Sequence, residues 1–512
     1  MENFSNDKEI GWRKLEPPMK IEYKQTNIEE ESLDIPKNIN NTPYGFFSLF
    51  IDKEYLLKIE KNSNDYLKHK KSNSINDDSK VTNKINNKNS IKNSTRANRC
   101  SYIYLENIEK YIGVLILMNI HKLPEYKDHW NNDPLLGSPV KRIMSKYEYE
   151  IINEFIHPED AKAKEEEKII KSIIEIMGKS KNYFNPGTVL TIDERMISFR
   201  GRTKFIVYDS SKPTKWGYRP YVLSDKKTGY TISMKLLQNL EENEENKGKM
   251  QILCEEFMKD IYEKTKKQYI LCTDGLYTTE DLLEEKNFFF IGAIRQNRIK
   301  SNRDNITKKI KKGEFEYFYK SCKKGNATLT KYNDSKQMYI ISNFINLPKE
   351  VKRNRWCKDK KKFIIDTYPN SIKVYSEYMK GVDLSNQLIS YYELNSKTYK
   401  WWKRIFFHLI DISIVNSYIL YKKYNKSAIT QKTFRLEIVK SIINKYKIEI
   451  DKERNNDFHF PVYCNERKTC KNCSLSKDYT TKKAPTTHYI CSNCKCYLCI
   501  NCFEKFHLNY YV

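Results

Sequence analysis

The sequence predicts a mixed α/β fold with a helical first third and a separate Cys-rich C-terminal module. Apolar residues recur at helical spacing through residues 42–187, whereas residues 188–298 alternate short β-branched runs with helical ones. Eight of the thirteen cysteines follow residue 463. A chain of 512 residues is long enough to form several domains of this kind.

The composition is strongly basic. Lys and Arg number 92 against 65 Asp and Glu, which gives a formal net charge of +27. An excess of this size favours a polyanionic partner, and nucleic acid is the first candidate. An AT-rich genome also enriches Lys, Asn, Ile and Tyr, so the charge supports this interpretation without deciding it.

The sequence does not predict secretion or insertion into a membrane. Its first residues, MENFSNDKEIGWRKLEPP, lack the apolar core of a signal peptide. The apolar stretch Ile405–Leu420 is interrupted by polar residues and is too short to span a bilayer. We therefore expect a soluble intracellular protein without a membrane partner, whose cysteines are reduced.

The first part of the chain is expected to be helical after a polar leader. Residues 1–41 show no sustained periodicity and are predicted to be disordered. Helical spacing begins at Thr42 and continues to residue 187, interrupted by the Asn/Lys/Ser tract 70–98, which is typical of a solvated loop.

Residues 188–298 carry the pattern of a mixed sheet. Strand-like runs occupy 189–199, 204–208, 218–224 and 229–236, followed by a helix at 250–264, a strand at 269–274, a helix near 278–286 and a strand at 288–294. A three-strand meander followed by alternating helices and strands predicts a sheet covered by helices on both faces.

The pattern changes again after residue 298. Residues 299–361 are predicted to be an insertion with basic runs at 308–312 and 358–362, which suit DNA contact, nuclear import or simple solvation. A helix with Asp383 near its start follows, and then long helices at 401–424 and 434–447.

Three aspartates occupy positions suited to phosphodiester chemistry. Asp193 lies in the first strand, Asp274 ends the fourth, and Asp383 lies on a helix beyond the insertion. Each alone is better explained as a cap or an ion-pair partner. Together, in a basic chain, they indicate an RNase H-like nucleotidyl transferase whose carboxylates hold two Mg²⁺ or Mn²⁺ ions about 3.5–4 Å apart.

Several motifs, in order, resemble the piggyBac-type transposases, which are DDE enzymes. The resemblance extends from about Thr42 to the C-terminus. It is carried by GVLILMNIHKLPEYKDHWNNDPLLGSP, IMSKYEYEIINEFIHPED, TIDERMISFRGR, KPTKWGYRPYVLSDKKTGY, TDGLYTTEDLLEEKNFFFIGAIRQNR, EYMKGVDLSNQ and WWKRIFFHLIDISIVNSYILY.

The resemblance implies a fold, an activity and partners. It implies that Asp193, Asp274 and Asp383 form the catalytic metal-binding triad of an RNase H-like domain (188–298 and 362–391) with an insertion (299–361). It further implies that residues 42–187 and 392–455 form one split helical domain for dimerisation and DNA binding. The expected activity is cut-and-paste transposition in the nucleus: strand nicking, hairpin formation and transfer into TTAA-like target DNA.

The chain departs from the family pattern at a few positions. Asn386 stands where the family often has a second Asp, three residues after the third catalytic one. An amide oxygen can still bind a metal, so Asn386 is a further candidate ligand without negative charge. Ala293 and Ser376 stand where Thr and Asn are frequent. A domesticated, catalytically inactive DNA-binding protein derived from such a transposase is the alternative function.

The Cys-rich segment 458–512 has the spacing of a zinc module. C-x2-C pairs bring two thiolates to one tetrahedral ion. Seven ligands at this spacing predict two structural zinc ions and an eighth ligand: Cys470, Cys473, Cys491, Cys494, Cys499, Cys502 and His507. His459 is our choice for the eighth, because an H-F-P element precedes the cysteines in the family.

Other zinc ligands and another function remain open. Cys464, Cys496 and His488 compete with His459, and an interleaved pairing is expected. The resemblance implies that this module binds the terminal inverted repeats of the element. A RING-like ubiquitin ligase would share such a module but leaves the aspartates unexplained.

Basic and aromatic residues near the motifs are candidates for DNA contact. Arg200, Arg202 and Lys215 lie close to the first aspartate and could bind phosphates, although ion pairs within the protein are nearly as good an explanation. Trp401, Lys403 and Arg404 combine charge with an aromatic ring. The competing explanation is that the Trp401–Trp402 pair packs in the core beneath the following helix.

Overall fold

The computed structural model describes residues 11–23, 29–78, 97, 100–236, 248–357, 361–394, 396–448, 459–475, 484–492 and 494–510. The chain forms two compact units. The larger consists of Met1–Lys122 and Tyr147–Ile442, and the smaller of Leu123–Lys146 and Ile443–Val512.

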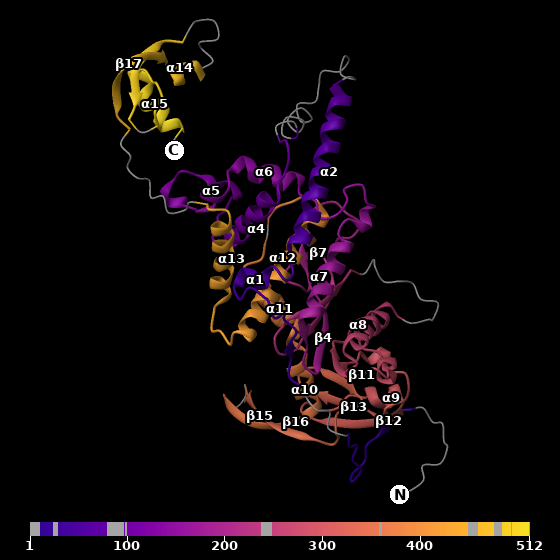
Figure 1. The fold of residues 1–512 in the computed structure, drawn as a ribbon. Coiled ribbons are helices and arrows are strands. Elements are labelled where there is room, and N and C mark those ends of the chain that lie inside the picture. Colours follow the sequence, from indigo (N-terminus) through magenta and orange to yellow (C-terminus); the bar gives the residue numbers. More distant parts are fainter. Residues whose placement is uncertain are drawn as a thin grey trace. The chain divides into compact units, whose positions relative to one another are not determined.

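A nine-stranded sheet lies in the larger unit, in the order β1-β12-β13-β14-β11-β10-β4-β8-β9 (Figure 1). At its centre β4 pairs in parallel with β10, and β10 pairs in parallel with β11. On the other side β8 and β9 continue as an antiparallel meander. The five strands β9-β8-β4-β10-β11 form the predicted RNase H-like core, with the bounds β4 Val189–Glu194, β8 Tyr221–Asp225, β9 Thr231–Lys235, β10 Tyr269–Thr273 and β11 Phe288–Ala293.

Part of the predicted insertion continues this sheet. Strand β14 pairs antiparallel with β11, and β13 and β12 extend the sheet outward. The following strands β15 and β16 pair only with each other and form a two-stranded ribbon. The bounds are β12 Phe315–Cys322, β13 Gly325–Asn333, β14 Gln337–Ser342, β15 Glu350–Cys357 and β16 Lys362–Pro369.

The prediction of disorder for residues 1–41 is wrong for most of the described part. Strand β1 (Arg13–Lys14) pairs with β12, and β2 (Ser32–Leu33) pairs with β3 (Phe184–Asn185). Trp12 is 2% exposed, and its indole N–H donates to Glu280 Oε1 at 2.9 Å. One large aromatic side chain thus anchors a polar segment whose partners lie far away in sequence.

Helices cover the sheet and build the rest of the larger unit. Helices α10 and α11 pack on β4, with α10 also against β11 and β14 and α11 also against β8, while α7 packs along β9. The predicted helix near 278–286 is a short 3-10 helix, η5 (Glu280–Glu284). The remaining bounds are α1 Pro43–Phe47, α2 Lys53–Asp78, α4 Leu105–Ile120, α6 Lys146–Phe155, η3 Glu165–Glu167, α7 Ile170–Tyr183, β5 Ile197–Ser198, β6 Val207–Tyr208, β7 Trp216–Tyr218, α8 Lys249–Thr265, η6 Gln296–Arg298, α9 Arg303–Thr307, α10 Asn370–Tyr378, α11 Lys380–Ser390 and α13 Gln431–Lys445.

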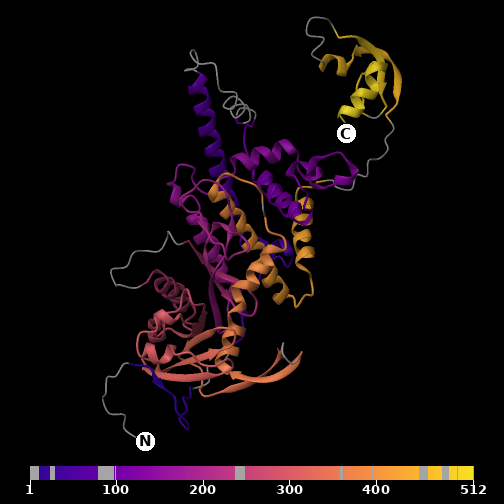
Figure 2. The ribbon, with the colours of Figure 1, turned by 180° about the vertical axis from the view of Figure 1, so that it is seen from behind.

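Helix α12 (Trp401–Tyr424) is the central helix of this layer. It packs against α1, α7 and α11, and the view from behind shows it among helices from the first part of the chain (Figure 2). Its length and composition would suffice to cross a membrane, but 83% of its most apolar window is buried inside the protein. It is therefore buried as a core helix is.

The smaller unit contains two described parts. Residues 123–146 form η1 (Tyr126–Trp130), η2 (Pro134–Leu136) and α5 (Val140–Ile143). The C-terminal part pairs β17 (Pro461–Thr469) with β18 (Thr486–Cys491) and adds α14 (Lys471–Leu475) and α15 (Ile500–Tyr510). Its small core consists of Cys470, Cys473, Leu498 and Phe506.

Candidate functional site

Asp193 and Asp274 lie next to each other at the carboxyl ends of two parallel strands. The ladder between β4 and β10 ends with the pair Ile192 and Thr273, and each aspartate is the following residue. Adjacent strands lie about 4.8 Å apart, and residues in register point to the same face. The sheet therefore brings these two predicted carboxylates together, at the edge where α/β sheets bind ligands.

The two aspartates belong to a larger cluster that the sequence analysis missed. Glu194 accepts hydrogen bonds from Tyr277 Oη at 2.8 Å and from Lys212 Nζ at 2.9 Å. The backbone N–H of Glu194 also donates to Asp193 Oδ1 at 2.8 Å. Glu194 adjoins Asp193, and Lys212 begins the KPTKWG stretch, so both lie within the quoted motifs.

Burial governs the charges of this cluster. It raises the pKa of Asp193, and the neighbouring Glu194 and Asp274 raise it further. Burial likewise raises the pKa of Asp274. Burial opposes ionisation of Glu194 too, but hydrogen bonds from Asp193, Lys212 and Tyr277 outweigh it and lower the pKa of Glu194. The protein thus stabilises the negative charge of Glu194 well, and it stabilises the negative charges of Asp193 and Asp274 less than their burial requires.

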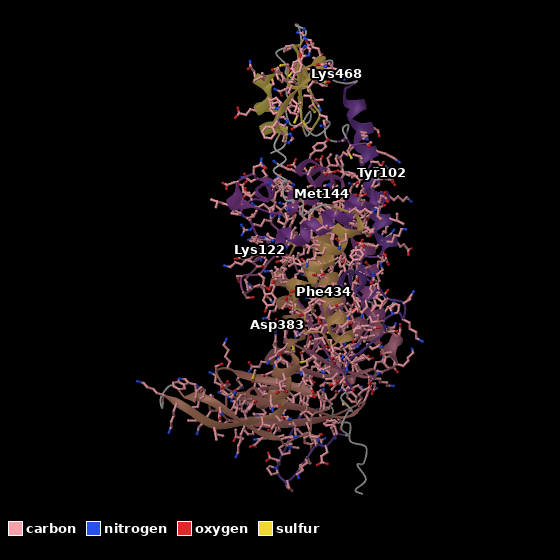
Figure 3. The ribbon with its side chains drawn as sticks, turned by 60° about the vertical axis from the view of Figure 1, so that its left-hand side comes forward. Tyr102, Lys122, Met144, Asp383, Phe434 and Lys468 are labelled. Atoms are coloured by element: carbon pink, nitrogen blue, oxygen red, sulfur yellow. The ribbon has the colours of Figure 1, made fainter. Side chains whose placement is uncertain are left out.

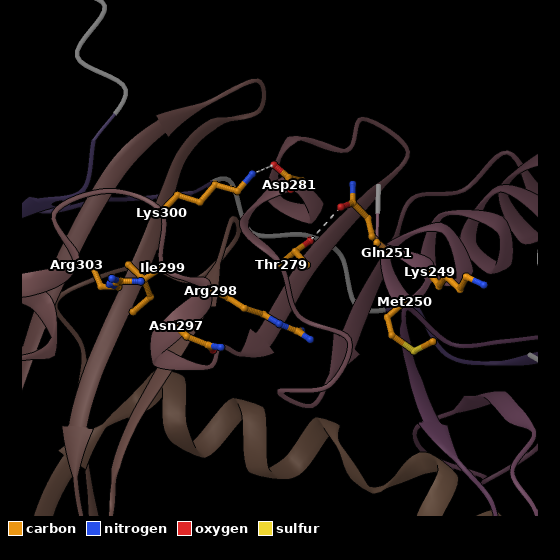
Figure 4. Close-up of a pocket in the computed structure, with 11 residues that line it drawn as sticks. Lys249, Met250, Gln251, Thr279, Asp281, Asn297, Arg298, Ile299, Lys300 and Arg303 are labelled. Atoms are coloured by element: carbon orange, nitrogen blue, oxygen red, sulfur yellow. Dashed lines mark hydrogen bonds and ion pairs between the residues drawn. The ribbon is translucent and has the colours of Figure 1, made fainter. Parts of the chain in front are cut away.

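Arg298 braces the loop that follows Asp274. Its Nη1 donates to the carbonyl oxygens of Leu276 and Thr278 at 2.8 and 3.0 Å. The backbone N–H of Leu276 donates to Asp274 Oδ1 at 2.8 Å, so the braced loop also holds the carboxylate. Arg298 further lines a hollow of about 630 Å³ at the start of α8, together with Lys249, Lys300 and Arg303 (Figure 4).

Asp383 lies on the helix on which the sequence places it, α11, but it makes none of the contacts described above for Glu194. It occupies the first turn of α11, which crosses the face of the sheet that carries Asp193, because Gly381 permits a close approach. A Cβ at Gly381 would lie 2.4 Å from Thr191 Oγ1. The Asp383 side chain, labelled in Figure 3, is exposed. It lines a hollow together with Lys226 and Lys227. Among the described residues, the three aspartates do not form a group with ligand atoms within 4.8 Å of one another.

Asn386 is engaged by an arginine. Its Oδ1 accepts a hydrogen bond from Arg195 Nε. The same guanidinium donates to Ser385 Oγ at 2.6 Å and lies 3.1 Å from His408 Nε2. Arg195 is 4% exposed. In this structure the Asn386 oxygen therefore satisfies a buried cation, and the idea that it binds a metal stays a prediction.

The acidic cluster fits a hard divalent cation. Two half-buried carboxylates with raised pKa values, at adjacent strand ends, present oxygen ligands of the kind that Mg²⁺ and Mn²⁺ prefer. A cation there would offset the cost of ionising both aspartates in a buried site.

The C-terminal module forms two clusters with the chemistry of zinc sites. One consists of His459, Cys491, Cys494 and His507, and the other of Cys470, Cys473, Cys499 and Cys502. The sulfurs of Cys473 and Cys502 lie 3.4 Å apart, and Cys473 and Cys499 3.9 Å. Thiolates on a tetrahedral zinc, with Zn–S bonds of about 2.3 Å, lie ~3.8 Å apart.

These clusters agree with the predicted ligands. All eight residues are used, His459 included, and the two sets interleave along the chain. The competitors lie outside both clusters. Cys464 Sγ lies 3.5 Å from Tyr497 Oη, His488 Nδ1 lies 3.2 Å from the Cys464 carbonyl, and Cys496 Sγ accepts from Lys471 Nζ at 3.4 Å.

The candidate DNA contacts fall into two groups. Arg200, Arg202 and Lys215 are exposed, so they remain available to a phosphate. Trp401, Lys403 and Arg404 are at most 4% exposed, and the structure contradicts their assignment to a DNA-contact surface.

Each residue of the second group has a structural partner. Trp401 Nε1 donates to Glu165, Lys403 to Asn153, and Arg404 to Ser198 O, Leu394 O and Glu393. Burial also lowers the pKa of Lys403 well below its usual value. Glu165, Asn153 and Ser198 lie more than 200 residues away in sequence, which is why the charge pattern alone suggested an exposed surface.

Comparisons with known proteins identify the family to which the chain belongs. The family model described as "Transposase IS4" matches residues 42–418, so the chain belongs to this transposase family. It is 22% identical over 423 residues to the human PiggyBac transposable element-derived protein 3, covering 78% of this chain and 69% of that protein.

Two further matches are to proteins with piggyBac names. The human PiggyBac transposable element-derived protein 2 is 21% identical over 333 residues, or 61% of this chain and 54% of its own length. A piggyBac transposase solved by cryo-EM as a synaptic complex with hairpin DNA matches the fold with a TM-score of 0.64. That match has 18% sequence identity and covers 92% of this chain and 98% of the other.

Proposed function

We propose that this protein is a cut-and-paste DNA transposase of piggyBac type. The observation that carries the proposal is the pair Asp193 and Asp274, half-buried side by side at the ends of β4 and β10. Its substrates would be the terminal inverted repeats of its element and TTAA-like target DNA. It would act in the nucleus as a homodimer.

The residues of the site have separate tasks in this proposal. Asp193, Asp274 and Asp383 would hold two Mg²⁺ or Mn²⁺ ions, which supply activation of the attacking oxygen and stabilisation of the leaving oxygen. Lys212 and Tyr277 hold Glu194 in place behind Asp193. Arg298 fixes the loop that carries Asp274. The eight Cys and His ligands would bind two zinc ions that stabilise the C-terminal fold.

The proposal includes an order of reaction steps. Water would nick one strand at the element end and release a 3′-hydroxyl, which would attack the opposite strand to form a hairpin. The hairpin would then be reopened and joined to target DNA. The related solved structure contains hairpin DNA, which supports this order for our chain.

One observation favours a second candidate function. Asp383 is exposed, whereas Asp193 and Asp274 are half-buried, and Asn386 pairs with Arg195. Relatives in the comparison are named as transposable element-derived proteins. A DNA-binding protein that has lost cleavage would keep the zinc module and the fold with this arrangement.

The test is strand cleavage by the purified full-length chain. A labelled duplex that carries the element's own flanking ends is incubated with Mg²⁺ or Mn²⁺, and nicked and hairpin products are separated by electrophoresis. We expect products from the native protein and at least roughly a hundredfold loss in Asp274→Asn, which keeps the shape of the side chain and removes its charge.

The matched control is Asp281→Asn. Asp281 lies in η5, the first helix after β10, and pairs with Lys300 outside the acidic cluster. We expect this variant to cleave like the native protein. Tight binding to the ends without any product in either metal would reject the transposase and support the second function.

A further inference from the structure

The ribbon β15–β16 has two faces of different character. It extends away from the nine-stranded sheet (Figures 1 and 3). On its inner face Arg353 and Arg355 each lie 3.2 Å from Asp334 Oδ1, and Arg353 Nη2 donates to Tyr332 Oη at 2.6 Å. Asp366 lies within 3.6 Å of both arginines. These interactions fix the ribbon to β13.

The outer face carries apolar side chains that the fold does not bury. It consists of Lys352, Asn354, Trp356, Phe363, Ile365 and Thr367, which pair across the two strands. Trp356 is 51% exposed, Phe363 68% and Ile365 71%. The two aromatic rings pack edge to face with centroids 5.3 Å apart. Three large apolar side chains on one narrow face are costly in water unless a partner covers them.

The charge around this face indicates what covers it. Residues 350–369 contain seven Lys and Arg against three Asp and Glu. The inner face pairs its arginines with carboxylates, whereas Lys352, Lys361 and Lys362 are exposed and have no ion pair among the described residues. Exposed cations beside exposed aromatic rings match nucleic acid better than an apolar protein surface.

We propose that the outer face of the β15–β16 ribbon is a DNA-binding element, with duplex DNA as its partner. A two-stranded ribbon fits a DNA groove. Trp356 and Phe363 contact the bases or open a base step, and Lys352, Lys361 and Lys362 contact phosphates. This inference rests on the proposed function in that both require DNA, but it needs no cleavage.

The first experiment measures affinity for a labelled duplex of unrelated sequence. The Trp356→Ala/Phe363→Ala variant of the full-length chain is expected to bind roughly tenfold more weakly. Lys352→Gln/Lys361→Gln/Lys362→Gln is expected to reduce the slope of log affinity against log salt by about 0.9 for each phosphate that the variant no longer neutralises. Met19→Ala is the matched control, because Met19 is an apolar side chain that is 44% exposed and lies outside the ribbon and outside the segments expected to bind DNA.

A second experiment observes Trp356 directly. Tryptophan fluorescence of the native protein is titrated with the same duplex and compared with Trp356→Phe, which keeps an aromatic ring. We expect part of the quenching to disappear in the variant while the affinity is kept within about twofold. Equal quenching in both proteins would overturn the proposal.

The outcomes separate this inference from the proposed function. Ribbon variants that bind DNA like the native protein, while cleavage still depends on Asp274, would reject the ribbon alone. Ribbon-dependent binding without any cleavage would reject the transposase and leave the ribbon standing. A variant that changes the oligomeric mass in sedimentation, without changing DNA affinity, would assign the face to a second copy of the chain and overturn the proposal.

Discussion

At the scale of single residues, His157 is a buried histidine that the fold keeps in its neutral form. It is 6% exposed, lies between the rings of Tyr66 and Trp402, and its Nδ1 is 3.0 Å from the Phe155 carbonyl. Burial, followed by the positive charge of Lys400, lowers the pKa of His157 to about 3. The folded protein therefore keeps this imidazole neutral at pH values where an unfolded chain would protonate it.

This difference predicts acid sensitivity. Because the folded pKa lies below the unfolded value of about 6.5, the contribution of His157 to stability is complete above about pH 6.5 and is lost as the pH falls toward 3. At about pH 5 the loss is about 2 kcal/mol. The midpoint temperature of thermal unfolding should fall more steeply from about pH 7 to about pH 5 for the native protein than for His157→Gln. The matched control is His69→Gln, because His69 is exposed.

Residues of the site differ in how well sequence predicts them. Asp193 and Asp274 could be found because strand ends and motif spacing are local properties. The burial of Lys403 and Arg404 could not, because it depends on acceptors at Asn153 and Leu394 that only the fold supplies. The exposure of Asp383 depends on how α11 packs on the sheet, and a helical pattern in the sequence does not predict that packing.

At the scale of elements, Arg195 joins three elements of the larger unit. It follows β4, it hydrogen bonds Asn386 and Ser385 of α11, and it contacts His408 of α12. Ser385 Oγ continues the network to Thr231 Oγ1 at 2.9 Å, at the start of β9. This network sets the position of the helix that carries Asp383 relative to the strand that carries Asp193.

Removing this guanidinium should destabilise the larger unit. Arg195→Met leaves the Asn386 oxygen and the buried Ser385 hydroxyl without their donor, at a cost of about 3 kcal/mol. We expect a lower midpoint of thermal unfolding by several degrees. Arg200→Met, five residues later and exposed, should change it little. Equal midpoints for both variants would show that the network contributes no stability.

The elements themselves were predicted unevenly. The core strands and α12 agree with the predicted ranges within a few residues, because buried strands and helices have strong apolar patterns. The pairing of β1 with β12 and the continuation of the sheet through β14 were not predicted, since strand pairing across distant segments leaves no local signal.

At the scale of the whole molecule, the two Cys/His clusters belong to a different unit from the one that holds the aspartates. Their ligands alternate in the order His459, then Cys470 and Cys473, then Cys491 and Cys494, then Cys499 and Cys502, then His507. Each ion would therefore close a loop that contains ligands of the other. Loss of one ion should weaken the second, because metal binding and folding are coupled in small modules.

We expect this coupling to affect both metal content and local stability. The native chain should contain two zinc ions by elemental analysis, and Cys491→Ser/Cys494→Ser at most one. Limited proteolysis of that variant should cleave within residues 459–510, while the larger unit keeps its unfolding temperature because its core lies elsewhere. Cys464→Ser/Cys496→Ser is the matched control, since both cysteines lie outside the clusters, and it should retain two ions. Two zinc ions in the Cys491/Cys494 variant would show that these thiolates are not ligands, and a shift in the unfolding of the larger unit would show that the two units do not fold independently.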